Sequence, residues 1–193
     1  VTAQQVIDNY AAALGGKSKL EAVKTVKTLS TIKVMGMEIE AITLEMAPNK
    51  SKAVQKIMGQ EMVQVFDGEK GYMMQAGQRM DLPAPAIEEA KKKRLFEVLS
   101  YNAADFKTVE KVTEEGKELY LLAGAGKKLY FDTKTNLLVK STSDKGDMVI
   151  LDYMEVDGIK FPKNLKLAMM GQNMEVTNNQ VIVNKEVSAE DFK

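Results

Sequence analysis

Short runs of β-forming residues, separated by glycine-containing turns, recur along most of the chain. From about Thr25 the apolar residues follow a period of two, which is typical of half-buried strands. Asp67-Gly68 and Asp157-Gly158 favour tight hairpin turns, because glycine readily adopts positive φ. No regular alternation of strands and helices is present, so an antiparallel sheet of about eleven strands is expected.

Three segments instead carry helical patterns. Residues 4–14 place apolar side chains on one face and end before Gly15-Gly16. Residues 18–23 begin with a capping-box pattern. Residues 87–99 follow two prolines and are moderately amphipathic.

These patterns predict a single domain over residues 1–193, of α+β class but mostly β. Strands are expected outside the three helices, in one strongly curved antiparallel sheet. Because an open apolar face must be buried against something, the helices should cover the concave side of that sheet. The helix at 87–99 should lie there as a lid.

Composition removes several classes of function. The chain has 193 residues, with 27 basic and 27 acidic side chains, so no charge surplus favours binding to nucleic acid. It has no histidine and no cysteine, which excludes imidazole bases, thiol nucleophiles, disulfides and the usual zinc ligands. The carboxylates show no spacing typical of acid–base catalysis. We therefore expect no enzymatic activity and no cofactor.

Methionine is unusually frequent, with thirteen residues that lie mostly in expected strands. Methionine fills irregular gaps in cores, and its flexible thioether also suits surfaces that adapt to varied ligands. A third interpretation is Cu(I) binding by segments such as 35–37, 73–74 and 169–174. Adjacent methionines on a strand point to opposite faces, so Met73-Met74 is a poor chelate, and no metal site is predicted.

Three turn motifs resemble the LolA-like periplasmic lipoprotein-carrier superfamily, in particular outer-membrane lipoprotein-sorting proteins. They are Phe66-Asp67-Gly68, Phe131-Asp132 with Thr135, and Tyr153 with Gly158 and Pro162. The resemblance implies an unclosed β-barrel with helices in its mouth and an apolar cavity that holds acyl chains without catalysis. It also implies a location in the periplasm, or on the periplasmic face of the outer membrane, of a Gram-negative cell.

The expected cavity lining combines strand and helix residues. Met62 and Phe66 share a strand face, as do Tyr72 and Met74, and Leu165, Leu167 and Met169 share a third. We expect these three sets to converge on one interior if the sheet curls. The full set of predicted lipid-contacting residues is Met62, Phe66, Tyr72, Met74, Ile87, Leu95, Val98, Leu165, Leu167 and Met169.

Two functions remain open at this point. One is a monomeric carrier that binds a lipid or an acylated lipoprotein. The other is an accessory or signal-sensing module with a filled core, which docks an envelope protein; a variant of this second function is a domain of a larger envelope protein. No stretch reaches the roughly 18 apolar residues of a transmembrane helix. The start, "VTAQQ", is what a chain would show after removal of a signal peptide or after trimming.

Overall fold

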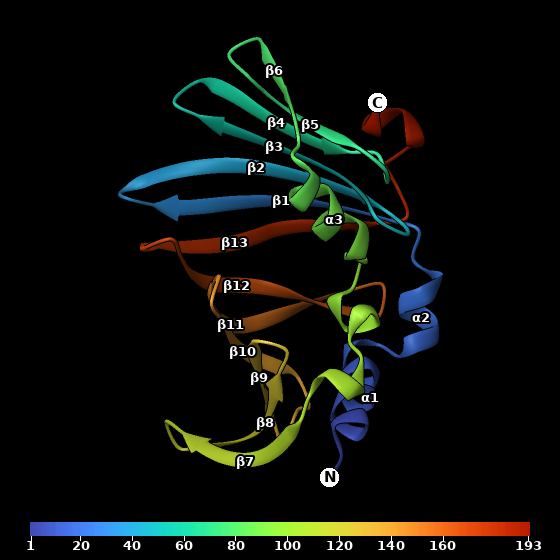
Figure 1. The fold of residues 1–193 in the computed structure, drawn as a ribbon, viewed down its shortest axis with the longest axis vertical. Helices are drawn as coiled ribbons and strands as arrows, with labels where there is room; N and C mark the ends of the chain where they lie inside the picture. The colour runs from blue at the N-terminus through green and yellow to red at the C-terminus, as the bar shows by residue number, and fades with distance from the viewer. The chain divides into compact units, whose positions relative to one another are not determined.

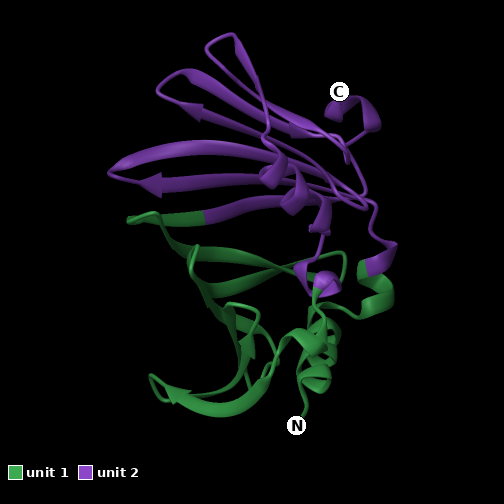
Figure 2. Cartoon of the chain, viewed as in Figure 1, with its two compact units in different colours: residues 1–20, 101–176 green, residues 21–100, 177–193 purple.

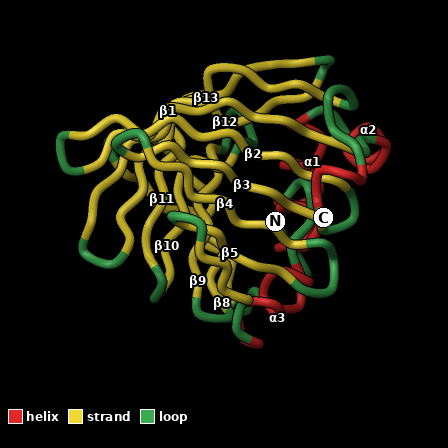
Figure 3. The backbone as a smooth tube through the Cα atoms, turned by 90° about the horizontal axis from the view of Figure 1, so that it is seen from above, coloured by secondary structure: helices red, strands yellow, loops and turns green.

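Strands make up most of the backbone of the computed structural model, which describes all residues from Val1 to Lys193 (Figures 1 and 3). The helices are α1 (Ala3–Leu14), α2 (Lys17–Ala22) and α3 (Ala84–Lys92), with 3₁₀ turns η1 (Glu97–Ser100), η2 (Ala103–Asp105) and η3 (Ala189–Phe192). The first six strands are β1 (Thr25–Val34), β2 (Met37–Met46), β3 (Lys50–Ile57), β4 (Gln60–Phe66), β5 (Gly71–Gln75) and β6 (Gln78–Asp81). The others are β7 (Thr108–Glu114), β8 (Lys117–Gly124), β9 (Lys127–Asp132), β10 (Leu138–Ser143), β11 (Gly146–Val156), β12 (Ile159–Met169) and β13 (Gln172–Val183).

The strands form one unclosed antiparallel sheet, as predicted, with 13 strands rather than about eleven. Their order is β6-β5-β4-β3-β2-β1-β13-β12-β11-β10-β9-β8-β7, so only β1 and β13 are neighbours without being consecutive. The count differs partly because residues 72–80 are a hairpin and not one strand. Ala76 and Gly77 have φ values of 52° and 78°, which close a tight turn between β5 and β6.

The chain divides into two compact units, which are described separately (Figure 2). Unit 1 contains residues 1–20 and 101–176, and unit 2 contains residues 21–100 and 177–193. The expectation of a single domain over 1–193 stays a prediction. None of the helices is long and apolar enough to span a bilayer.

In unit 1, helix α1 packs on the strands through its apolar face. The ring of Tyr10 meets Phe131 of β9 edge-on, with centroids 5.2 Å apart. The helix ends at Gly15, where a Cβ atom would lie 2.7 Å from the carbonyl oxygen of Gly158. This close approach requires glycine at position 15 and fixes α1 against the β11–β12 hairpin.

That hairpin has the turn that its sequence predicts. Asp157 and Gly158 have φ values of 53° and 77° and connect the paired residues Val156 and Ile159. Pro162 lies within β12, an interior strand, where a residue without an N–H is normally disfavoured. Its partner is Tyr153, where the register shifts at a bulge, and a bulge tolerates a residue that has no N–H.

Helix α3 also differs from its predicted range of 87–99. It begins earlier, after Pro83, since proline suits a helix start, and it ends at Lys92. Lys93 is extended, with ψ of 150°, and the Arg94 guanidinium donates to the carbonyl oxygens of Lys91 and Lys93. In a continuous helix over 87–99, Phe96 would point away from the apolar side. The break after Lys92 allows its side chain to become buried instead.

Candidate ligand-binding site

The strand register divides the side chains of unit 2 between two faces of the sheet. Directly paired residues of antiparallel strands lie on the same face. Glu45 pairs with Ser51, which pairs with Phe66, and we call this the α3 face. Val65 pairs with Tyr72 on the opposite side, which we call the η3 face because Phe192 of η3 packs there against Val65.

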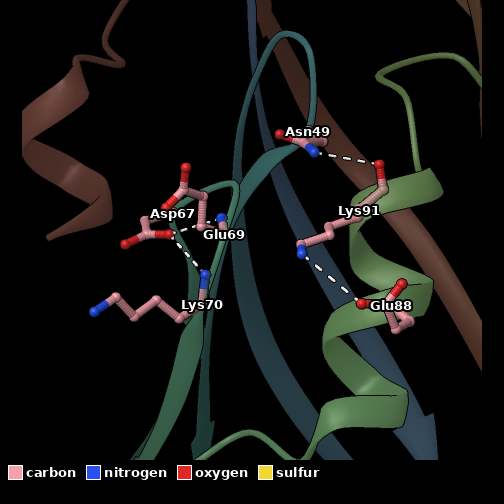
Figure 4. Close-up of polar contacts among 6 residues, drawn as sticks. All are labelled: Asn49, Asp67, Glu69, Lys70, Glu88 and Lys91. Atoms are coloured by element: carbon pink, nitrogen blue, oxygen red, sulfur yellow. Dashed lines mark hydrogen bonds and ion pairs between the residues drawn. The ribbon is translucent and has the colours of Figure 1, made fainter.

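Helix α3 covers the α3 face but buries none of its own residues. The Asn49 side chain, in the β2–β3 turn, donates a hydrogen bond of 3.2 Å to the carbonyl oxygen of Lys91 (Figure 4). Within the helix, Lys91 pairs with Glu88 at 3.8 Å, an exposed contact that adds little stability. The helix is therefore held over the strands by few contacts.

A pocket of about 230 Å³ lies between α3 and the strands. Phe66, Leu82 and Leu95 contribute apolar side chains, and Phe66 is only 2% exposed. The lining residues of the helical segment and its end are Ala86, Glu89, Ala90, Lys93 and Arg94. Within α3 the spacing of three and four places Ala86, Glu89 and Ala90 on one helix face. On the strand side the pocket is lined by Phe66 together with the polar residues Glu45, Ser51 and Gln64. Two alanines lie in its roof, and the cationic groups of Lys93 and Arg94 lie beside it.

Glu45 contributes the ionisable group of this pocket. Burial raises the pKa of its carboxyl group to about 7, and the Lys93 ammonium lowers that pKa by a smaller amount. At neutral pH the carboxyl group therefore exchanges between the neutral and charged forms. It can donate a hydrogen bond to a ligand in the first form and accept one in the second.

A second pocket, of about 460 Å³, includes residues of the η3 face. The Arg79 guanidinium lies 4.0 Å from the centroid of the Tyr72 ring, and it pairs with Asp81 at 3.7 Å. The Tyr72 hydroxyl donates to the carbonyl oxygen of Lys193 at 2.8 Å. Ile87 and Phe192 supply apolar surface. This pocket is richer in fixed polar contacts than the one under α3.

The side chain of Asp67, in the turn beside this pocket, stabilises that turn. The Asp67 carboxylate accepts hydrogen bonds from the backbone N–H groups of Glu69 and Lys70, both at 2.9 Å (Figure 4). These bonds hold the pKa of Asp67 below its usual value. The carboxylate is thus engaged in closing the β4–β5 connection.

The predicted cavity residues of unit 2 are distributed over three pockets. Phe66 and Leu95 meet under α3, Tyr72 and Ile87 line the η3-face pocket, and Met62 borders a hollow of about 270 Å³ at the β3–β4 turn. The register places Met62 and Phe66 on the α3 face.

Tyr72 and Met74 lie on the η3 face instead, because Tyr72 pairs with Val65 and Met74 with Val63. The four side chains therefore do not share one face, which corrects the expected convergence of these two pairs. Val98 lies in η1 rather than in a helix that continues from α3, and it is buried.

In unit 1, the predicted residues of β12 do share a face. Leu165 pairs with Ile150 and Leu167 with Met148, and Met169 follows at the same period. Met148 and Leu129 both pair with Ser141, so this is also the face of β9 that carries Leu129 and Phe131, where α1 packs. A role of Leu165, Leu167 and Met169 in lipid binding stays a prediction.

Sequence reasoning missed Glu45. It lies between Leu44 and Met46, and a half-buried strand with these neighbours inside would direct it to solvent. In the structure β2 has a buried residue on each face nearby, Ala41 on one and Leu44 on the other. Burial on both faces removes the period that would have revealed this carboxyl group.

Comparison with family sequence models and with curated protein sequences gives no match. Among solved structures, the chain is similar to an outer membrane lipoprotein-sorting protein domain from Vibrio parahaemolyticus (TM-score 0.63, 8% identity, 99% of this chain and 97% of the other). It is also similar to a DUF1329 family protein from Desulfovibrio piger (0.61, 9%, 99% and 97%). A LolA superfamily protein from Nitrosomonas europaea matches at 0.59 and 10% identity over 100% and 98% of the two chains. At these identities the likeness shows the fold, which is LolA-like, as the turn motifs predicted.

Proposed function

We propose that this protein binds the acyl chain of a lipid or of an acylated lipoprotein in the pocket under α3, without catalysis, and acts as a carrier or sorting protein. The occupant is held by apolar contact with Phe66, Leu82 and Leu95. Its polar end lies near Glu45 and Lys93.

The observation that carries this proposal is that α3 lies over the strands without closing the space beneath it. A helix that only completed a core would bury its apolar residues at a density close to that of an organic crystal. Here α3 lies over the buried side chain of Phe66, and a pocket of about 230 Å³ remains between the helix and the strands. A helix without a fully buried residue can move away at lower cost than a core helix and admit a chain-like ligand.

The fold and the composition support the same function. The lipoprotein-sorting domain from Vibrio parahaemolyticus and the LolA superfamily protein from Nitrosomonas europaea share this fold over nearly their whole lengths. The chain has no histidine or cysteine, and no group of three or more carboxylates could hold a metal ion. We further propose that the protein works as a monomer in the periplasm, or at the periplasmic face of the outer membrane, of a Gram-negative cell.

Binding of a fluorescent fatty acid tests the proposal with two variants of one helix. Ala90→Trp places a large side chain in the pocket, whereas Lys92→Trp adds the same group at an exposed position of α3. Neither change disturbs a buried residue, so both variants should fold. The parent and Lys92→Trp should bind the probe, and Ala90→Trp should bind it at least about tenfold more weakly, because the pocket is filled.

Equal binding by the two variants would contradict the pocket assignment. No binding by the parent would instead favour the alternative, an accessory or signal-sensing module that docks an envelope protein.

A further inference from the structure

Three methionines lie near one another on one face of the adjacent strands β4, β5 and β6 of unit 2. Met73 of β5 pairs directly with Met80 of β6. Met62 of β4 pairs with Gln75, two residues from Met73, so Met62 and Met73 are diagonal neighbours on the same face. Direct partners have Cβ atoms about 5 Å apart and diagonal ones about 7–8 Å, within reach of long, flexible side chains. Met62, Met73 and Met80 are called the thioether cluster below.

The thioether cluster is surrounded by neutral amides. Gln64 pairs with Met73, Gln75 pairs with Met62, and Gln75 also pairs with Gln78, which places the three glutamines on the same face. The nearby charged residues of β6, Arg79 and Asp81, lie on the opposite face, since they pair with Met74 and Tyr72. This part of the face therefore offers three sulfur atoms and no carboxylate.

The cluster is also accessible. Met80 is 69% exposed and lies on β6, an edge strand of the sheet. At such an exposed position a polar residue would be the usual choice. Met62 and Met73 are partly buried, and Met62 borders the hollow of about 270 Å³ at the β3–β4 turn. A core methionine would be enclosed, and a strand surface is more often built from β-branched or polar residues. Gap filling does not account for Met80.

We propose that the thioether cluster binds a soft monovalent metal ion, Cu(I), with Ag(I) as its redox-inert analogue. Thioether sulfur selects soft ions, whereas Mg²⁺, Ca²⁺ and Mn²⁺ are normally held by carboxylate oxygen atoms, which this part of the face does not provide. The directly paired Met73 and Met80 supply two neutral sulfur atoms, with Met62 beside them as the diagonal neighbour of Met73, and binding involves no redox step. The site is independent of the pocket under α3 and does not rest on lipid binding.

Titration of the protein with Ag(I), followed by native mass spectrometry and by the ¹³C resonances of the methionine methyl groups, tests this site. One ion should bind per chain and shift the methyl signals of Met62, Met73 and Met80. Met73→Leu and Met80→Leu should each weaken binding by about tenfold or more, since loss of even an outer-shell partner costs a metal site that much. Cu(I) in competition with bicinchoninate should give the same order of affinities.

Met74→Leu is the matched control, because Met74 is adjacent in sequence but faces the other side of the sheet. Methionine-to-leucine changes conserve volume and apolar character, so the fold and the binding of a fatty acid should be retained in all variants. Absence of Ag(I) binding by the parent would overturn the proposal. So would equal losses in Met73→Leu and Met74→Leu, or shifts spread evenly over all methionine methyl groups.

Discussion

Glu45 is the residue whose chemistry depends most on its position in the fold. Its carboxyl group ionises near pH 4.5 in an ordinary setting but near pH 7 under α3, because burial disfavours the charged form. The unfolded chain therefore loses this proton before the folded protein does. Between about pH 4.5 and 7, the folded state retains a proton that the unfolded state has released, and stability falls as the pH rises.

Replacing Glu45 with glutamine should remove this dependence. Glutamine keeps the shape and hydrogen-bonding capacity of the protonated acid but does not ionise. Relative to the parent, Glu45→Gln should be more stable above pH 7, by an amount up to about 3 kcal/mol, and should show little difference near pH 4. Urea denaturation of both proteins at pH 4, 6 and 8 measures the effect. A constant difference between the two proteins across this range would show that Glu45 does not titrate as described.

At the scale of elements, helix α3 is attached to the strands mainly through its C-terminal end. The Asn49 amide contacts the Lys91 carbonyl group, one of the last in the helix, where carbonyl groups have no partner within the helix. A side-chain hydrogen bond of this kind contributes about 1 kcal/mol. It can thus control opening of the helix without dominating the stability of the whole chain.

Asn49→Ala should release α3 selectively. Hydrogen exchange of the backbone amides in α3 should become about fivefold faster, as expected for the loss of about 1 kcal/mol, while exchange in β2 and β3 changes little. Asn173→Ala, at an exposed position of β13, is the control and should leave α3 unchanged. If exchange in α3 responds equally to both variants, the tether has been assigned wrongly.

The elements also show what sequence patterns can and cannot predict. The period of two and the Asp-Gly turns correctly predict the antiparallel sheet, since both depend on local geometry. The predicted end of α3 is wrong because burial of Phe96, a tertiary effect, requires the helix to stop earlier. The Arg94 guanidinium then satisfies the carbonyl groups of Lys91 and Lys93 locally. Of the ten predicted cavity residues, Phe66 and Leu95 meet in one pocket. Which residues of different strands share a face of the sheet could not be predicted, because this depends on how the strands pair.

At the scale of the whole molecule, the proposed function depends on the space that the fold leaves between α3 and the strands. Hairpin turns account for the pairing of consecutive strands, whereas β1 and β13 pair although they are distant in the sequence. The LolA-like fold was nevertheless predictable from the resemblance carried by three turn motifs spread along the chain. The pocket itself was not, since its walls come from β2, β3, β4 and the segment 82–95, whose spacing is set by packing. The proposed binding site is therefore best tested by a measurement that shows which residues the bound ligand contacts.

Photo-crosslinking with a fatty acid that carries a diazirine on its chain, followed by mass spectrometric mapping, tests the central claim most directly. We predict adducts on the peptides that contain Phe66, Ala90 and Leu95, suppressed by excess unlabelled fatty acid and absent from Ala90→Trp. Additional adducts on Leu165, Leu167 or Met169 would support the predicted contribution of β12. Adducts confined to the peptides with Tyr72, Arg79 and Phe192, or labelling that unlabelled fatty acid does not suppress, would contradict a binding site under α3.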